Sequence, residues 1–317
     1  MGIRVLGTGS YVPERILTND DLAKMVDTSD EWIVQRVGVR ERHVSEHETA
    51  ADMGIQAAKR ALEAAEVKAE ELELIVAATC SSDSICPTVA GFVQQGVGAS
   101  CPAFDVNSAC SGFLFALETA SALMEKNHLK CVLVLGAEHL SRIVDWSDRS
   151  TCVIFGDGAG AVVLGEGSSC LASRLFTQGG DSVLSIPGGR GNSPFFTREQ
   201  PEMKINMNGQ ETFKFAVRRM AEDLQLLCAD AGITTDDLAF IVPHQANTRI
   251  IDLTARRLGI PMEKFILNIE KYGNTSSASV PISFDGLVRS GRLKKGDKIA
   301  MCAFGGGLSS AGCILEW

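Results

Sequence analysis

A cysteine in the segment AFDVNSACSGFLFALETASALMEK stands where a strand-like stretch gives way to a helix-like one. AFDV leads through a short turn to Cys110, and a strongly helical segment begins near Ser111. A thiol at a helix N-terminus experiences the positive end of the helix dipole, which lowers its pKa and favours the thiolate. Backbone N–H groups there can also bind an oxyanion. We therefore predict that Cys110 is a nucleophile, whereas the other nine cysteines fit better as small buried hydrophobic residues.

Three other polar or glycine-rich segments follow strand-like or turn-like sequence. His244 comes directly after a buried strand that Pro243 ends, and a core or capping role suits it as well as a catalytic one. Asn274 lies in KYGNTSSASV, which taken alone predicts a turn and the N-cap of a helix beginning near Ala278. The FGGG run at residues 304–307 could complete an oxyanion hole or simply form a tight hairpin. The residues alone leave these alternatives open.

The bulk composition excludes several classes of protein. The formal net charge is −9 and no Lys/Arg-rich run occurs, so we expect no general binding to nucleic acid or to anionic membranes. The N-terminal sequence does not read as a signal peptide, and the apolar runs are too short to span a bilayer. Neither a CxxC pair nor zinc spacing is present, and no glycine loop fits a dinucleotide site. We expect a cytoplasmic protein with reduced cysteines and no metal site.

The alternation of strand-like and helix-like segments predicts an α/β fold, and the chain repeats itself. Three segments recur in the same order: residues 61–76 resemble 227–242, residues 131–137 resemble 298–304, and residues 158–164 resemble 309–315. This pattern predicts a duplicated α/β unit with an N-terminal half at 1–168 and a C-terminal half at 169–317. Sites in open α/β sheets form outside the carboxyl ends of the strands. We therefore expect the chemistry at the junction of the two halves.

Six motifs occur together in a fixed order. They are TSDEWIVQRVGVRERH from Thr28, ACSG at Cys110, DRSTCVIFGDGAGAVVL from Asp148, PHQAN at His244, GNTSSAS at Asn274 and FGGG at 304–307. Together they resemble β-ketoacyl-acyl carrier protein synthase III, the initiating condensing enzyme of dissociated fatty-acid synthesis, essentially from end to end. The resemblance implies a thiolase-like fold, with two duplicated halves packed as α-β-α-β-α layers, and a homodimer. The Cys/His/Asn set argues against elongating synthases. Plant-type polyketide synthases share it, but GNTSSAS and FGGG fit the initiating class better.

The resemblance also implies a two-step reaction. Cys110 attacks an acyl-CoA, with acetyl-CoA the expected primer, and malonyl-acyl carrier protein is then decarboxylated to an enolate. Neutral His244 and Asn274 donate hydrogen bonds to that enolate, and the amides of Cys110 and Gly306 bind the tetrahedral oxyanion. The enolate carbon then attacks the acyl thioester. Acyl-CoA is a substrate in this scheme, and no metal or redox cofactor is implied.

Matching positions supply the expected binding residues. Trp32 and Arg149 would sandwich the CoA adenine, and Arg36 and Thr28 would contact its phosphate-bearing portion. Taken alone, Trp32 reads equally well as a half-buried helix residue. The pantetheine tunnel would be lined by Met207, Gly209, Ala246 and Asn247.

An acidic carrier protein needs a local basic patch on this acidic chain. Arg249 and Arg256 share one face of a helix and Arg257 is adjacent, while Lys214 and Arg218 form a similar pair on another helix. Alternatively, both pairs simply lie on solvent-exposed helix faces and bind no partner.

Two departures from the family pattern bear on the acyl chain. Cys86 stands before Pro87 where an aromatic residue is usual, on a segment that in the family crosses the homodimer interface to close the neighbour's acyl pocket. We therefore expect primers longer than acetyl to be tolerated. Leu308-Ser309-Ser310 replaces the more usual threonine–tryptophan.

Three rival functions are weaker. A related ketosynthase of secondary metabolism with a different acceptor is the main alternative. A non-catalytic carrier-binding protein would not need the intact reactive set, and a nucleotide-dependent oxidoreductase does not fit the glycine loops.

Overall fold

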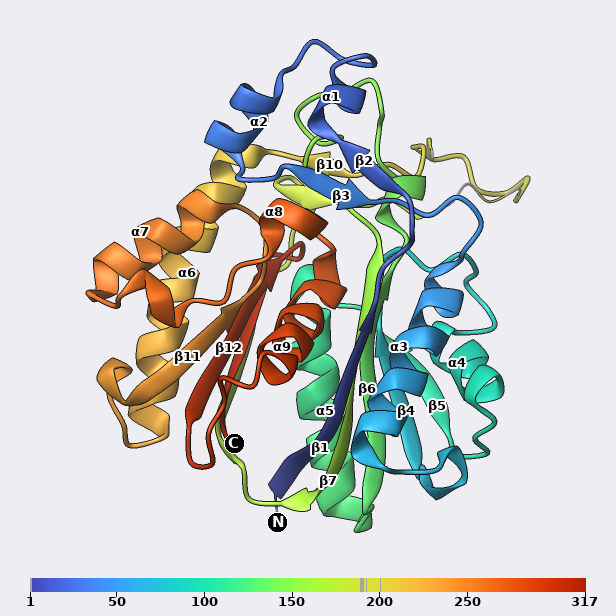
Figure 1. Cartoon of the computed structure of the whole chain (residues 1–317). Coiled ribbons are helices and arrows are strands. Elements are labelled where there is room, and N and C mark those ends of the chain that lie inside the picture. The colour runs from blue at the N-terminus through green and yellow to red at the C-terminus, as the bar shows by residue number, and fades with distance from the viewer. Residues whose placement is uncertain (1, 189–190, 192, 200) are drawn as a thin grey trace.

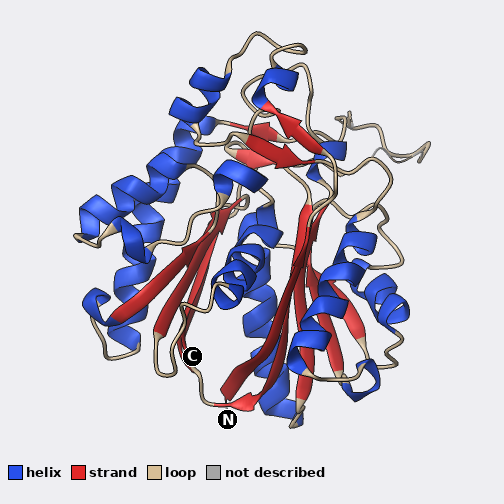
Figure 2. Ribbon diagram, viewed as in Figure 1, coloured by secondary structure: helices blue, strands red, loops and turns tan. Residues whose placement is uncertain are grey.

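Two β-sheets face each other across a pair of helices, with further helices on both outer surfaces (Figures 1 and 2). The computed structural model describes residues 2–188, 191, 193–199 and 201–317. The first sheet has the order β1-β7-β6-β4-β5 and the second β11-β12-β13-β8. The first comprises β1 (Gly2–Tyr11), β4 (Leu74–Ala78), β5 (Ala103–Val106), β6 (Cys131–Glu138) and β7 (Gly158–Gly167). The second comprises β8 (Cys170–Thr177), β11 (Leu238–Pro243), β12 (Lys298–Gly305) and β13 (Ser309–Glu316).

The helices divide into three layers around these sheets. The central layer, which contacts both sheets, holds α5 (Gly112–Asn127) and α9 (Ser279–Arg289). Beside the first sheet lie α3 (Ala50–Ala65) and α4 (Val89–Val97), and beside the second lies α6 (Gly209–Asp230), against which α7 (Thr248–Leu258) packs. The order of layers is therefore α-β-α-β-α, which confirms the predicted fold class.

Short elements complete the chain. They are β2 (Ile16–Thr18), α1 (Asn19–Leu22), α2 (Asp30–Arg36), β3 (Glu41–His43), β9 (Leu184–Ser185), β10 (Asn206–Met207) and α8 (Ile269–Tyr272). The 3₁₀ turns are η1 (Ala69–Glu71), η2 (Ala109–Ser111), η3 (Leu140–Arg142), η4 (Thr235–Asp237), η5 (Met262–Lys264) and η6 (Ser276–Ala278). The first four of these short strands and helices cover one end of the molecule, at the top of Figure 1.

The two sheets repeat one topology. In the first, β1 and β7 pair antiparallel, as do β7 and β6, and β6 and β4 pair parallel. The second sheet has the same pairings: β8 and β13 are antiparallel, as are β13 and β12, and β12 and β11 are parallel. The strands matched by sequence similarity occupy equivalent places, so the predicted duplication is confirmed. The division between residues 168 and 169 falls between β7 and β8 and stays a prediction.

The central layer explains why the inner strands are almost wholly apolar. Both faces of β4 and β6 are covered by helices, so every residue of each strand is buried. The core between the sheets includes Phe113 of α5 and Phe284 of α9, packed against Val76, Val134 and Met301. Burial of this layer fixes the separation of the sheets and hence the place where their strand ends meet.

A glycine on β6 lets the second half approach the first closely. A Cβ atom at Gly136 would overlap the carbonyl oxygen of Ser277, which belongs to the segment after Asn274. The backbone of one half therefore rests directly on a strand of the other, and any side chain at this position would push them apart.

We predict that Gly136→Ala lowers the free energy of unfolding by about 1–3 kcal/mol, because an added methyl group overpacks this contact. Urea unfolding would measure the change. The control is Gly286→Ala on the exposed side of α9, where an added Cβ meets nothing within 4 Å. It should be neutral or stabilise by up to about 1 kcal/mol. Equal stability of the Gly136 variant and the unaltered protein would contradict the close contact.

Candidate active site

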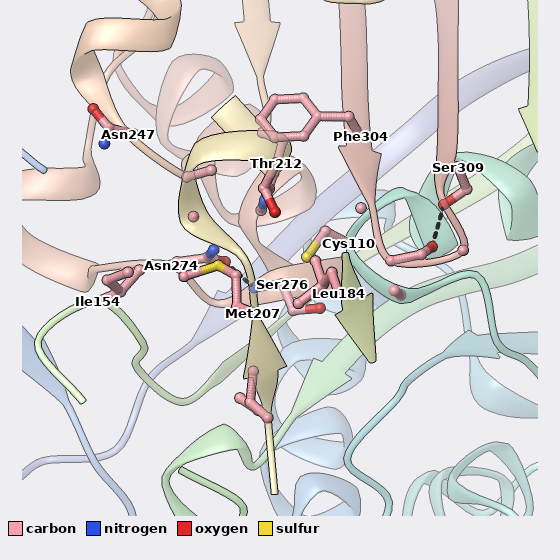
Figure 3. A pocket seen from close by; sticks show the side chains of 18 of the residues that line it. Cys110, Ile154, Leu184, Met207, Thr212, Asn247, Asn274, Ser276, Phe304 and Ser309 are labelled. Carbon is pink, nitrogen blue, oxygen red and sulfur yellow. Dashed lines mark hydrogen bonds between the residues drawn. The ribbon is translucent and has the colours of Figure 1, made fainter. Parts of the chain in front are cut away.

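The cavity at the junction of the halves gathers the reactive side chains. Its volume is about 980 Å³, and Cys110, His244, Asn274 and the glycine turn at 305–307 all line it. Cys110 comes from the first half and the other groups from the second. Figure 3 shows Cys110, Asn274 and Ser276 close together, with Phe304 nearby. The structure thus brings together four motifs that the sequence separates by up to about 200 residues.

A tight turn presents Cys110 at the end of β5. Cys110 lies in η2, immediately before α5, and is 8% exposed. The preceding Ala109 has φ of 46°, the left-handed region that a non-glycine residue adopts only under constraint. The constraint comes from the glycine turn, since a Cβ atom at Gly305 would lie 2.7 Å from the Cys110 nitrogen. The two turns therefore pack backbone against backbone.

Serine hydroxyls hold these two turns together. Ser309 Oγ lies 2.8 Å from Ser111 Oγ and donates to the carbonyl of Gly306 at 2.8 Å. Ser309 is one of the residues that departs from the family's usual sequence after the glycines. Here it ties the glycine turn to the start of the nucleophile's helix.

The protonation state of Cys110 differs from the prediction. Burial raises its pKa to about 12, Glu138 acts in the same direction, and a hydrogen bond with Ser276 opposes them. The prediction of a pKa lowered by the helix dipole is therefore wrong for the substrate-free protein. Burial removes hydration from the thiolate and so disfavours the charged form of Cys110.

A buried carboxylate behind the nucleophile was not foreseen. Glu138 is 0% exposed at the end of β6 and accepts hydrogen bonds from Thr79 Oγ1 at 3.2 Å, from Cys80 N at 3.1 Å and from the Ser81 hydroxyl. From the other half, Ser277 Oγ lies 2.7 Å from it. The only sequence signal is a charged residue ending a continuous apolar run.

Cys80 also escaped sequence reasoning. It lines the cavity, and its Sγ lies 3.5 Å from Ser276 Oγ, the hydroxyl that also contacts Cys110. Burial raises its pKa well above the ordinary value. The apolar part of the same cavity wall includes Leu140, Phe155, Leu184 and Ile205, none of which the sequence singled out.

His244 is neutral and firmly held. It is 1% exposed, and burial lowers its pKa to about 3. Its Nδ1 lies 2.6 Å from Ser279 Oγ, and its ring meets the edge of Phe304 at a centroid distance of 5.3 Å. Neutrality is what the expected hydrogen-bond donor to an enolate requires.

The residue after His244 anchors the loop. Gln245 is buried, and its amide nitrogen donates to the carbonyls of Pro243 at 2.9 Å and Ile266 at 3.0 Å. Its Oε1 accepts from the backbone nitrogens of Asn268 at 3.1 Å and Ile269 at 3.2 Å. Although Gln245 belongs to the PHQAN motif, no pattern in the sequence predicted a role for it.

Asn274 is fixed at both backbone and side chain. Its nitrogen donates to Ile154 O at 2.9 Å and its carbonyl accepts from Gly156 N at 3.0 Å. Its Oδ1 accepts from Ser276 N at 2.8 Å, so the NH₂ group is the end that can donate to a substrate.

The helix after Asn274 begins close to where the sequence predicted, at Ser279, but its predicted capping is wrong. The N-cap residue is Ala278, which has no side-chain cap. The Thr-Ser-Ser run instead forms η6, and Ser277 Oγ turns inward to Glu138 and to Ala78 O, 2.9 Å away.

The residues expected to bind CoA fall into two groups. Arg36, Met207, Gly209, Ala246 and Asn247 line the cavity. Asn247 caps α7 by accepting from Arg249 N at 2.9 Å, and donates to Arg36 O at 2.9 Å. Its side chain is therefore engaged in holding the rim of the cavity.

Trp32, Arg149 and Thr28 lie outside the residues that line the cavity. The Trp32 ring stacks with Arg36, 5.6 Å from its centroid, and with Arg149, 5.2 Å away. Arg149 also donates to Asp27 O at 2.6 Å. Because Trp32 and Arg149 already touch, an adenine could enter between them only if Arg149 moved. Thr28 Oγ1 is buried and has no hydrogen-bond partner among the described residues.

The expected basic residues are divided between two places. Lys214 and Arg249 line the cavity, and Arg249 lies over the Phe213 ring at 5.5 Å. Farther along α7, Arg256 pairs with Asp252 at 3.0 Å, which partly offsets its charge. Arg257 and Arg218 are exposed.

Cys86 does not line this chain's cavity. It is exposed on the loop between β4 and α4, next to Ile85, which is 97% exposed.

Within the described residues, no group of three or more His, Cys, Asp or Glu side chains is arranged to hold a metal ion. In the same part of the chain, no helix combines the length and apolarity needed to cross a membrane.

Fold and site together define a condensing enzyme of the thiolase fold, and comparisons with known proteins agree. Residues 104–179 match the family 3-oxoacyl-[acyl-carrier-protein] synthase III, and residues 228–317 match its C-terminal domain. The β-ketoacyl-[acyl-carrier-protein] synthases III of Clostridium acetobutylicum and Xanthomonas campestris are 47% and 46% identical, over 99% of this chain and 98% of each relative.

Solved structures show the same relationship. The 3-oxoacyl-[acyl-carrier-protein] synthase III of Aquifex aeolicus superposes with a TM-score of 0.93 at 44% identity, covering 100% of both chains. The priming β-ketosynthase of the R1128 polyketide pathway gives 0.93 at 36% identity, covering 99% of this chain and 96% of that one. The chain belongs to the 3-oxoacyl-[acyl-carrier-protein] synthase III family and is an acyltransferase of the condensing type.

The raised pKa of Cys110 has a direct consequence for its reactivity. At pH 7 the thiolate is a very small fraction, so alkylation by iodoacetamide should accelerate about tenfold per pH unit from pH 7 to 10 without a plateau. Mass spectrometry of the Cys110 peptide would measure it, in a Cys86→Ser background that removes the exposed thiol and with folding checked at each pH. A plateau near pH 8 would instead mean that the dipole outweighs burial.

Proposed function

We propose that this enzyme joins an acyl-CoA primer, acetyl-CoA in the first instance, to malonyl-acyl carrier protein by decarboxylative Claisen condensation, and so initiates fatty-acid synthesis. The observation that carries the proposal is the convergence of Cys110, His244, Asn274 and the glycine turn on one cavity. The similarity to 3-oxoacyl-[acyl-carrier-protein] synthases III supports carrier protein as the acceptor. Acyl-CoA is a substrate, and the ten free cysteines fit a cytoplasmic location.

In the first step Cys110 forms a thioester with the primer. Its sulfur bonds to the acyl carbon, the bond from that carbon to the CoA sulfur breaks, and the thiol proton ends on CoA. The amides of Cys110 and Gly306 stabilise the negative oxygen of the tetrahedral intermediate. The tight packing of Gly305 on the Cys110 nitrogen supports this role for the glycine turn.

In the second step the malonyl group loses CO₂, and the electrons of the broken carbon–carbon bond move onto the thioester oxygen. His244 and the Asn274 NH₂ group donate hydrogen bonds to that oxygen. The enolate carbon then bonds to the acyl carbon, the bond from that carbon to the Cys110 sulfur breaks, and the released thiolate takes up a proton from water to regenerate the thiol. A histidine with pKa about 3 stays neutral at physiological pH, so it donates a hydrogen bond without changing charge.

The substrates enter the cavity past two basic residues that line it, Lys214 and Arg249. We assign the phosphate-bearing part of CoA to Arg36 and Thr28, and the adenine to Trp32 and Arg149. The buried hydroxyl of Thr28 has no hydrogen-bond partner in the part of the chain that the structure describes. Met207, Gly209, Ala246 and Asn247 enclose the pantetheine arm. Lys214 and Arg249 at the cavity rim receive the acidic carrier protein, with Arg256 and Arg257 as outer contacts.

A homodimer completes the acyl pocket in this proposal. The almost fully exposed Ile85, beside Cys86 and Pro87, is the kind of apolar loop tip that a partner subunit would bury. Cys86 is smaller than the aromatic residue usual in the family, so the pocket admits primers longer than acetyl.

A second candidate function rests on the likeness to the priming β-ketosynthase of a polyketide pathway. In that case the acyl-Cys110 chemistry is the same and the acceptor differs. Comparable rates with malonyl-CoA and with malonyl-carrier protein would favour it, whereas dependence on the carrier protein favours fatty-acid initiation.

The two half-reactions can be separated experimentally. Incubation with acetyl-CoA should add one acetyl group to the Cys110 peptide, and Cys110→Ala should remain unmodified by intact-mass analysis. His244→Ala and Asn274→Ala should keep self-acylation but lose malonyl decarboxylation about a hundredfold to a thousandfold, since each removes an oxyanion-type donor. A panel from acetyl- to octanoyl-CoA in the same assay measures the primer range. Near-normal decarboxylation by both variants would refute the proposed mechanism.

Carrier docking predicts a selective defect. Arg249→Glu should weaken use of malonyl-carrier protein by up to roughly fivefold at low salt, because an exposed charge pair contributes up to about 1 kcal/mol. The defect should shrink as salt rises, and acetyl-CoA self-acylation should be unaffected. Lys126→Glu, an exposed site near the far end of α5, is the control for net charge. Equal loss in both half-reactions would indicate damage to the tunnel instead.

A further inference from the structure

The hydrogen bond between His244 and Ser279 crosses from the catalytic loop to the central helix layer. Both side chains are buried, and Nδ1 lies 2.6 Å from Ser279 Oγ. Ser279 is the first residue of α9 and is absent from the residues that line the cavity, whereas His244 lines it. Ser279 thus contacts the imidazole at Nδ1, and Nε2 is the ring nitrogen that can face the cavity.

The hydrogen-bond partners of Ser279 determine the direction of this bond. Its Oγ also accepts from Gln245 N at 3.4 Å, a backbone group that can only donate. If Nδ1–H donated as well, Oγ would accept twice, and its own proton would have no acceptor among the described residues in a buried site, which is costly. If Oγ–H donates to Nδ1, both groups are satisfied. Nδ1 is then unprotonated, and the ring proton of the neutral histidine sits on Nε2.

We propose that Ser279 is a positioning residue that holds His244 as the neutral tautomer protonated on Nε2, and so keeps an N–H donor directed at the cavity. The inference rests on the proposed role of His244 as a donor to the enolate. With the opposite tautomer, Nε2 would be a lone-pair acceptor, and it would repel the enolate oxygen instead of stabilising it.

The surroundings of His244 reinforce the same arrangement. The backbone nitrogen of His244 donates to Cys302 O at 2.8 Å, and Gln245 fixes the following residue through four hydrogen bonds. The ring edge against Phe304 limits rotation about the side-chain bonds. Other residues therefore fix the backbone of His244 and the plane of its ring. The contact with Ser279 is the one that determines which ring nitrogen carries the proton.

The test is nitrogen NMR of the folded enzyme with ¹⁵N-labelled histidine. The His244 signals, assigned as those lost in His244→Ala, should show a protonated Nε2 and an unprotonated Nδ1 at pH 7. Ser279→Ala should shift both signals towards a mixture of tautomers and lower malonyl decarboxylation about tenfold, as expected for one lost hydrogen bond. Self-acylation by acetyl-CoA should remain close to that of the unaltered enzyme.

Ser283→Ala is the matched control. Ser283 lies one turn later on α9, and its hydroxyl bonds to Ser279 O at 2.8 Å and Asn268 Oδ1 at 3.1 Å instead of to His244. This variant should keep the nitrogen signals and the decarboxylation rate. A protonated Nδ1 in the unaltered enzyme, or unchanged signals and rate in Ser279→Ala, would overturn the inference. Normal decarboxylation by His244→Ala would refute the proposed function, while the nitrogen signals would still decide the role of Ser279.

Discussion

The buried carboxylate of Glu138 joins the two halves of the molecule at the place where the reactive side chains meet. It takes hydrogen bonds from the segment that follows β4 in the first half and from Ser277 in the second. A buried carboxylate is costly unless its lone pairs are satisfied, so the donors must stay in place. Because Ser277 follows Asn274 closely, the position of Asn274 relative to Cys110 depends on this network.

Burial is the second constraint, and it acts on the pKa values of two groups in opposite directions. It disfavours the charged form of either group, so it raises the pKa of Cys110 to about 12 and lowers that of His244 to about 3. Both groups are therefore neutral at pH 7. Neutrality suits His244 to the proposed role of hydrogen-bond donor to an enolate, whereas it leaves Cys110 with a proton that the proposed first step must remove.

Duplication of the fold divides the chemistry between the halves. In the proposed mechanism the first half supplies the nucleophile after β5, and the second half supplies hydrogen-bond donors after β11, after α8 and after β12. Close backbone contacts, at Gly136 with Ser277 and at Gly305 with Cys110, let the two sets approach. The turns that follow equivalent strands in the two halves thus carry different chemical groups, and these groups meet because both sheets direct their strand ends to one cavity.

The sequence by itself determined the α/β class and the duplication, because both depend on local pattern: apolar runs and repeated segments. A strand–turn–helix junction also distinguishes Cys110 from the other nine cysteines, and its role as nucleophile stays a prediction. Its motifs also indicated the family. It could not determine the protonation states, since a pKa depends on burial by residues distant in the chain, and the local dipole argument for Cys110 was wrong for that reason. Nor could it assign roles to Gln245 and Ser279, for which no sequence pattern is distinctive, or to Glu138, whose only sequence signal is its place at the end of an apolar run. Their partners lie up to 139 residues away, as for Glu138 and Ser277, and only the packing of the two halves brings them within hydrogen-bond distance.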